Sequence, residues 1–251
     1  MQKRLNWVPL ACLCTVAAAH AGVVVEATWQ NMPPGEVGAT QTMYFSGLRA
    51  HLEDPYGVIL YKDGLRYALD KRRKLYPAPS TRQSLMKSAQ EMKNSGLGPW
   101  QWKVTRLDQS RTIGSWTCQV YDVSQETTKK TTLVKRLCVV GYDQLPNGEE
   151  VRNAVHAITW LNAPCDGESE PGRWIVEQPA AVESAVNGFV VAMRSLRGGS
   201  ERELVVRSWH VEDTPAQLFT VPADYDPDQT VTVRCPKPHK GSKTPVGLPG
   251  C

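Results

Sequence analysis

Two copies of a His-x-Glu-Asp pattern supply the residue types in this chain that bind metal ions. His51 and Glu53 belong to the first copy, and His210 and Glu212 belong to the second. Residues two apart on a β-strand point to the same face, so each copy would present an imidazole beside a carboxylate. Each copy also ends an expected strand, where water-facing polar side chains are common. Because no third element brings the two copies together, we expect no metal site.

The residues needed for nucleophilic catalysis lack an activating sequence context. No Gly-x-Ser-x-Gly motif occurs in the chain. His156 falls within an expected amphipathic helix, where a histidine is more often a surface residue than a general base. Two carboxylates could meet to cleave a glycoside, but nothing in the sequence singles out such a pair. We therefore expect that the protein is not an enzyme and uses no cofactor.

The first 21 residues have the features of a secretory signal peptide. Lys3 and Arg4 precede a mostly apolar run over residues 5–19, and small residues follow it. We expect cleavage after Ala21 and a periplasmic or secreted product. A lipoprotein signal ending at Cys12 is disfavoured because the apolar run before Cys12 is very short. No later run is long enough for a membrane-spanning helix.

The charge balance of the mature chain argues against nucleic acid as a partner. Loss of the signal peptide lowers the formal net charge from +4 to +2, whereas nucleic-acid binding needs a concentrated basic face. The one dense basic run covers residues 71–74 and lies at an expected turn. A solvated charge run is the commoner explanation for it, and contact with an anionic lipid or glycan is the rarer one.

Five cysteines remain after removal of the signal peptide, and their spacing fits no zinc, haem or Cys-x-x-Cys motif. Cys118 and Cys138 fall on neighbouring expected strands joined by one loop, so we predict a structural disulfide between them. Closing that loop should stabilise the fold by about 3 kcal/mol. Of Cys165, Cys235 and Cys251, the sequence does not indicate which pair and which stays free.

Hydrophobic periodicity and turn signals predict strands, one helix, more strands, two helices and final strands. The expected strands cover residues 23–29, 40–52, 58–61, 65–69, 74–77, 100–107, 112–123, 131–140, 188–196 and 203–211. Helices are expected from a cap at Ser80 or Thr81 to Asn94, after Asn147, and from Pro179 to residue 186. This order predicts a single α+β domain over residues 22–234, with helices packed on a curved antiparallel sheet. Residues 235–251 form a Pro/Gly/Lys-rich C-terminal tail.

Aromatic residues are the best candidates for a binding role. Most of the tryptophans are expected in the core, because large aromatic side chains dominate core burial in sheet proteins. A subset would line an apolar concave face and bind a ligand there. We assign that role to Tyr44, Trp100, Trp102 and Trp116.

Three patches of the chain resemble an uncharacterised bacterial periplasmic family. These are "GSWTCQVYDV" followed by "KRLCVV", the early "VILYKDGLRYALD" with "KLYPAP", and the late "QLFTVPADYDP". That family is similar in strand pattern to the lipoprotein carriers of the LolA, LolB and RseB type. The resemblance implies an unclosed half-barrel with helices plugging its concave side. The family has no established activity, and the Cys165 loop and the tail have no counterpart in it.

These observations together lead to two functional expectations. The first is a non-enzymatic exported protein that holds a lipid, a lipoprotein acyl group or another apolar ligand on a concave sheet face. The alternative is a cell-envelope subunit that docks on a protein partner by a sheet edge or by its tail. With five cysteines in the mature chain, one is left over, and it could form a disulfide with that partner.

Overall fold

The computed structural model describes residues 21–31, 39–55, 57–95, 101–126, 131–165, 173–196, 202–228 and 230. Residues 1–20 of the predicted signal peptide, Trp100 and the tail from residue 235 lie outside this part of the chain. Ala21, after which we expect cleavage, is the first residue of the first strand and pairs with Asp213.

A single twelve-stranded sheet dominates the described chain. Its strands are β1 (Ala21–Gln30), β2 (Thr40–Ser46), β3 (Arg49–Glu53), β4 (Gly57–Lys62), β5 (Leu65–Asp70), β6 (Leu75–Pro77), β7 (Gln101–Ile113), β8 (Trp116–Glu126), β9 (Thr131–Gly141), β10 (Gly188–Ser195), β11 (Glu203–Asp213) and β12 (Asp226–Asp228). Their order across the sheet is β12-β6-β5-β4-β3-β2-β1-β11-β10-β9-β8-β7. Neighbouring strands are antiparallel except for the short parallel pair β12–β6.

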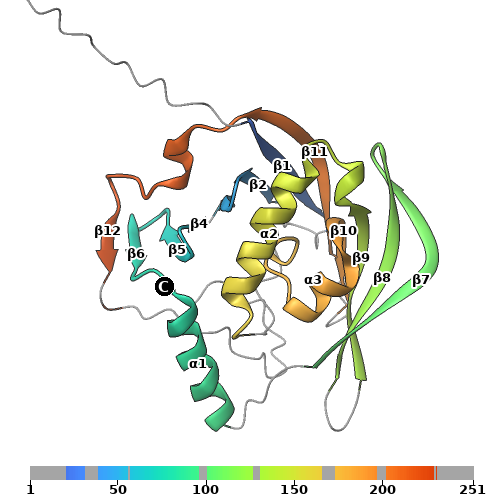
Figure 1. The fold of residues 1–251 in the computed structure, drawn as a ribbon, viewed down its shortest axis with the longest axis horizontal. Coiled ribbons are helices and arrows are strands. Elements are labelled where there is room, and N and C mark those ends of the chain that lie inside the picture. Colours follow the sequence, from blue (N-terminus) through green and yellow to red (C-terminus); the bar gives the residue numbers. More distant parts are fainter. Residues whose placement is uncertain are drawn as a thin grey trace, which may run out of the picture.

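The sheet bends into an open half-barrel with helices inside its curve (Figure 1). The helices are α1 (Arg82–Asn94), α2 (Gly148–Asn162) and α3 (Ala180–Val186), with 3-10 turns η1 (Tyr142–Gln144) and η4 (Ala216–Phe219). The α2 helix packs against β1 and β2, and α3 packs against β7. This arrangement confirms the predicted α+β fold class with helices on the concave face. No helix in the described ranges has the length and apolar character needed to cross a bilayer.

One tight hairpin is missing from the sequence prediction, and the turn of another is misplaced. The expected strand over residues 40–52 is in fact β2 and β3, joined at Gly47, whose φ is +60°. The expected strand from residue 112 begins too early, because the chain turns at Gly114, with φ +56°, between β7 and β8. In both places glycine adopts a left-handed conformation that suits a two-residue hairpin loop. Strand-like alternation continues on either side of such a turn and hides it.

The larger core lies between the concave face of the sheet and the helices. Strands β1 and β2 contribute Val23, Val25, Met43 and Phe45, all at most 3% exposed. The apolar stripe of α2 packs onto this face with Val151, Ala154, Val155, Ile158 and Leu161. A second, smaller cluster, made of Val58, Leu60, Leu69 and Tyr225, lies on the convex face of the sheet. The sheet is therefore covered on both sides over β4 and β5.

Candidate functional site

Residues 173–178, between α2 and α3, fill the middle of the concave face; we call them the plug segment. Trp174, Ile175 and Val176 are at most 1% exposed. The segment makes a single turn, in which the Val176 and Glu177 amides donate to the Arg173 carbonyl. Burying an apolar side chain contributes about 1.5–3 kcal/mol. The plug segment is thus held largely by the hydrophobic contacts that an apolar ligand would also make.

The Trp174 ring lies between an aromatic residue and a cation from the strands near the β7 edge. The Trp102 ring meets it edge-on, with 6.0 Å between ring centroids. On another side, the Lys135 ammonium lies 5.0 Å from the centroid of the Trp174 ring, within reach of a cation–π interaction. Lys135 is 1% exposed, which is rare for a lysine. The indole N–H of Trp174 is buried and has no hydrogen-bond partner among the described residues.

A buried polar network ties the plug segment to the sheet. Tyr61 on β4 donates a short hydrogen bond to the Glu177 carboxylate of the plug segment. The Arg66 guanidinium on β5 donates to the Tyr61 hydroxyl at 3.1 Å and to Glu177 at 3.3 Å. The Asn162 amide at the end of α2 donates to the same hydroxyl at 3.1 Å. We call these four residues the latch, because they join two strands, α2 and the plug segment.

Electrostatics inside the latch favour its charged form. Burial raises the pKa of the Glu177 carboxyl, but the Arg66 and Arg173 guanidiniums and the Tyr61 hydrogen bond outweigh this and lower the pKa below its ordinary value. Burial, followed by the nearby Glu177 carboxylate, raises the pKa of the Tyr61 phenol. Burial alone would lower the pKa of Arg66, yet Glu177 and Tyr61 raise it. The pair is therefore ionised and the phenol is neutral at physiological pH.

The cavity that the described residues form beside the plug segment is small. A cavity of about 10 Å³ lies at the rim of the concave face, enough for about one water molecule. Its lining is Gln41, Met43, Leu52, Glu53, Asp54, Gly57, Ile59, Arg173 and Val176. Ligand sites for small molecules are usually hundreds of Å³ in volume. A cavity of this size would not admit an acyl chain while the plug segment stays in place.

The predicted ligand-binding residues do not all lie on one face. Trp102 and Trp116 are partly buried and pack against the larger hydrophobic cluster, and Trp102 contacts Trp174 of the plug segment. Tyr44 lies on the convex face, because Met43 and Phe45 on either side of it point into the core. Trp100 is outside the described residues. The assignment of Tyr44, Trp100, Trp102 and Trp116 to a ligand site therefore stays a prediction.

Tyr44 belongs instead to a polar surface on the convex face. Its ring meets the His51 ring edge-on, with 5.3 Å between centroids. Burial and then three carboxylates raise the pKa of Tyr44, namely Glu53, Glu212 and Glu26. The alternation of strand residues could have revealed this position, but the sequence does not show which face of β2 is the concave one.

The two His-x-Glu-Asp copies lie in one row of this convex face but far apart. His51 pairs with Tyr44, Tyr44 with Val24, and Val24 with His210. Three strand spacings separate the two histidines, or about 14 Å. That distance is too long for them to bind one ion. His51 instead directs Nδ1 at the Leu218 carbonyl of η4, 2.6 Å away, and so helps to hold the η4 turn on the sheet.

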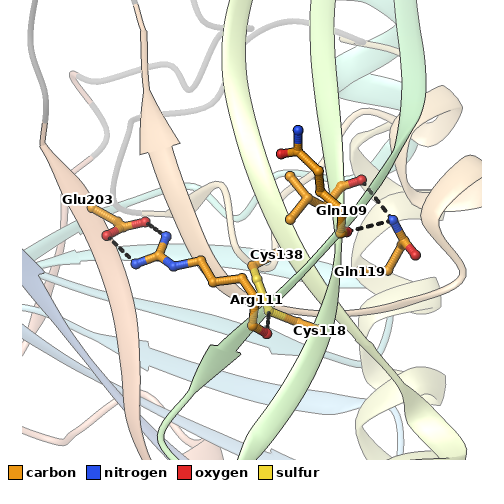
Figure 2. Close-up of a disulfide and its surroundings, with 7 residues drawn as sticks. Gln109, Arg111, Cys118, Gln119, Cys138 and Glu203 are labelled. Carbon is orange, nitrogen blue, oxygen red and sulfur yellow. Dashed lines mark hydrogen bonds and ion pairs between the residues drawn. A yellow bond between two sulfur atoms is a disulfide. The ribbon is translucent and has the colours of Figure 1, made fainter.

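The predicted disulfide between Cys118 on β8 and Cys138 on β9 is confirmed (Figure 2). Its Cα atoms are 5.3 Å apart, within the normal range for a disulfide. Beside it, Arg111 on β7 forms a two-pronged ion pair with Glu203 on β11. These strands are separated by β8, β9 and β10 in the sheet, so the pair joins strands that are not neighbours. Cys165 is also disulfide-bonded, which excludes it as the free thiol.

Comparison with known proteins finds similarity only at the level of structure. No family model matches the sequence, and no curated protein matches it. An uncharacterized conserved protein from Thermus thermophilus is similar, with a TM-score of 0.44, 6% identity, and coverage of 83% of this chain and 90% of that one. A LolA superfamily protein from Nitrosomonas europaea gives a TM-score of 0.29 and 8% identity, covering 80% and 90% of the two chains. A putative outer membrane lipoprotein-sorting protein domain from Vibrio parahaemolyticus gives a TM-score of 0.31 and 9% identity, covering 81% of this chain and 90% of that one.

The last two names refer to the LolA superfamily and to lipoprotein sorting. At TM-scores below 0.5, however, none of them carries an argument about function. The function has to be argued from the residues of this chain.

Proposed function

We propose that this chain is an exported, non-enzymatic protein that binds an apolar ligand, the acyl chain of a lipid or lipoprotein, on the concave face of its sheet. The plug segment is the observation that carries this proposal. Three apolar side chains in an irregular turn occupy the centre of the half-barrel, where a ligand would lie. A ligand acyl chain takes their place, and the plug segment leaves.

Exchanging the plug segment for an acyl chain changes the hydrophobic free energy little. Acyl chain and plug segment bury similar apolar surface against the same core, so that term nearly cancels. The polar cost of opening falls on the latch, where Arg66 and Tyr61 lose the Glu177 carboxylate. Ligand affinity is reduced by the fraction of molecules that remain closed. Weakening the latch should therefore raise the affinity for an apolar ligand.

The first test is whether the protein carries a lipid. The mature chain is purified from the periplasm without detergent, then analysed by native mass spectrometry and by solvent extraction. We expect a bound acyl lipid in a fraction of the molecules. A discrete co-purifying protein in place of lipid would favour the alternative of an envelope subunit.

The second test uses a fluorescent fatty acid and a matched pair of variants. Tyr61→Phe removes the hydroxyl at the centre of the latch, whereas Tyr67→Phe removes a hydroxyl next to the convex cluster. We expect the apparent dissociation constant to fall severalfold in Tyr61→Phe and to stay unchanged in Tyr67→Phe. Absence of probe binding by the wild type and by Tyr61→Phe, with no lipid on the purified protein, would refute the proposal.

A further inference from the structure

Two large apolar side chains are exposed on the neighbouring helices α1 and α2. Trp160 of α2 is 58% exposed and Met86 of α1 is 56% exposed. Arg82 joins them, because its guanidinium lies 4.6 Å from the centroid of the Trp160 ring and also donates to the Trp160 carbonyl. Arg82 and Met86 are four residues apart on α1, so they share one side of the helix. Arg82 therefore contacts Trp160 and lies one helical turn from Met86.

The same side of α1 is basic. At 100° per residue, Lys93 lies about 20° from Met86 around the helix axis and Lys87 about 100° away. Both lysines are exposed. Glu91, the one acidic residue of this helix, lies one turn after Lys87 and beside it, so the outer side of α1 carries three basic residues and one acidic residue. The buried residues of α1, Leu85 and Ser88, face the body of the protein. Positive charge therefore gathers around exposed apolar groups on the outer side.

We propose that this surface, the α1 face (Arg82, Met86, Lys87, Lys93 and Trp160), docks on the headgroup region of an anionic phospholipid bilayer. Tryptophan favours the interface between headgroups and acyl chains, where its ring is apolar and its N–H is polar. Long basic side chains extend their charges to phosphate while their methylenes stay in apolar surroundings. Methionine adds an apolar contact, and the net positive charge of the face complements anionic lipid.

The helix is preorganised for this contact. Thr81 caps α1 and forms a reciprocal capping box with Ser84, so the helix exists before any membrane is met. The helix also projects from the rest of the fold, at the bottom of the view in Figure 1. Docking by the α1 face is independent of ligand binding on the concave face, since it requires no movement of the plug segment.

Vesicle co-flotation of the mature chain tests the proposal. The probes are vesicles of phosphatidylcholine with phosphatidylglycerol at about 3:1, and vesicles of phosphatidylcholine alone. We expect binding to the anionic vesicles that weakens as salt is raised, and at least about tenfold weaker binding to the neutral vesicles. Lys87→Gln with Lys93→Gln should weaken binding to the anionic vesicles about 30-fold, from about fivefold for each basic residue. Met86→Ala with Trp160→Ala should weaken it about tenfold or more.

Matched controls separate this face from general charge and hydrophobicity. Arg72→Gln with Arg73→Gln makes the same charge change at the exposed β5–β6 turn, and Leu48→Ala removes an apolar side chain that is 67% exposed. Both controls should bind within about twofold of the wild type. Four results overturn the proposal: equal losses in the arginine control, equal binding to both kinds of vesicle, no vesicle binding, or a solution dimer that Met86→Ala with Trp160→Ala disrupts. Because the lysine substitutions are at exposed positions, that variant remains informative even where the tryptophan variant folds poorly.

Discussion

Removing the carboxylate of Glu177 should be one of the most destabilising single changes in this protein. The Arg66 and Glu177 side chains are only 14% and 6% exposed, and their charges face each other across the interior. In Glu177→Leu, the guanidinium stays buried with its main counter-charge gone. Breaking a buried ion pair from one side typically costs about 3–5 kcal/mol. That is a large share of the roughly 5–15 kcal/mol that usually separates folded from unfolded protein.

The second substitution shows whether the cost comes from the stranded charge. Arg66→Met combined with Glu177→Leu removes both charges and fills much of their volume with apolar atoms. Such paired replacements are often neutral or stabilising, so the double variant should recover most of the loss. The double variant would then lose much less free energy of unfolding than the sum of the two single variants, which corresponds to a coupling energy of several kcal/mol between Arg66 and Glu177.

Urea unfolding at neutral pH, followed by both tryptophan fluorescence and far-ultraviolet circular dichroism, measures these differences. Coincident transitions would justify a two-state free energy of unfolding. If Glu177→Leu costs less than about 1 kcal/mol, or if the double variant loses the sum of the single losses, the latch is not the charged, coupled network inferred above. Glu149→Leu, at an exposed position on α2, is the control and should change little.

Three further predictions concern the acid sensitivity of the latch, the disulfide and the cap of α1. The folded-state pKa of Glu177 is lowered from 4.5, so its contribution to stability is complete above pH 4.5 and is lost as the pH falls through the folded-state pKa. In urea unfolding from about pH 3 to pH 7, the free energy of unfolding should therefore fall more steeply with acid in the wild type than in Arg66→Met with Glu177→Leu. Replacing Cys118 and Cys138 by alanine should lower the free energy of unfolding by about 3 kcal/mol, since the bridge closes a 20-residue separation; a loss under about 1 kcal/mol would contradict a stabilising role. Thr81→Ala should cost about 1 kcal/mol and raise hydrogen exchange within α1, and unchanged exchange there would argue against the cap.

Local sequence signals predict the parts of the fold that depend on local physics. Thr81 is an expected cap for α1 and accepts the amide hydrogen bond from Ser84. Pro179 is expected at the start of α3 and occupies its N-cap position. The Cys118–Cys138 bridge follows from two strands joined by one loop. Helix capping, hydrophobic periodicity and the pairing of strands joined by one loop involve residues close in the chain. Their free energies therefore depend on short stretches of sequence.

The candidate site is only partly accessible to such reasoning. The sequence singles out Trp102 but not its contact partner Trp174. The plug segment has no hydrophobic periodicity, so nothing in the sequence marks Trp174 as more buried than the other tryptophans. The latch is not foreseen at all. Glu177 is 116 residues from Tyr61 and 111 from Arg66, and nothing local brings the two strands to the plug segment.

The sequence by itself determined most of the strands and the three helices, and which two thiols can bridge, because each depends on neighbours along the chain. Tertiary structure alone decided which face of β2 points inward, so that Tyr44 lies outside while Met43 and Phe45 are in the core. It also decided that Trp174 fills the hollow and that Glu177 meets Arg66. Inward and outward faces differ only once the sheet has curved, and curvature is a collective property of many strands and the helices they enclose.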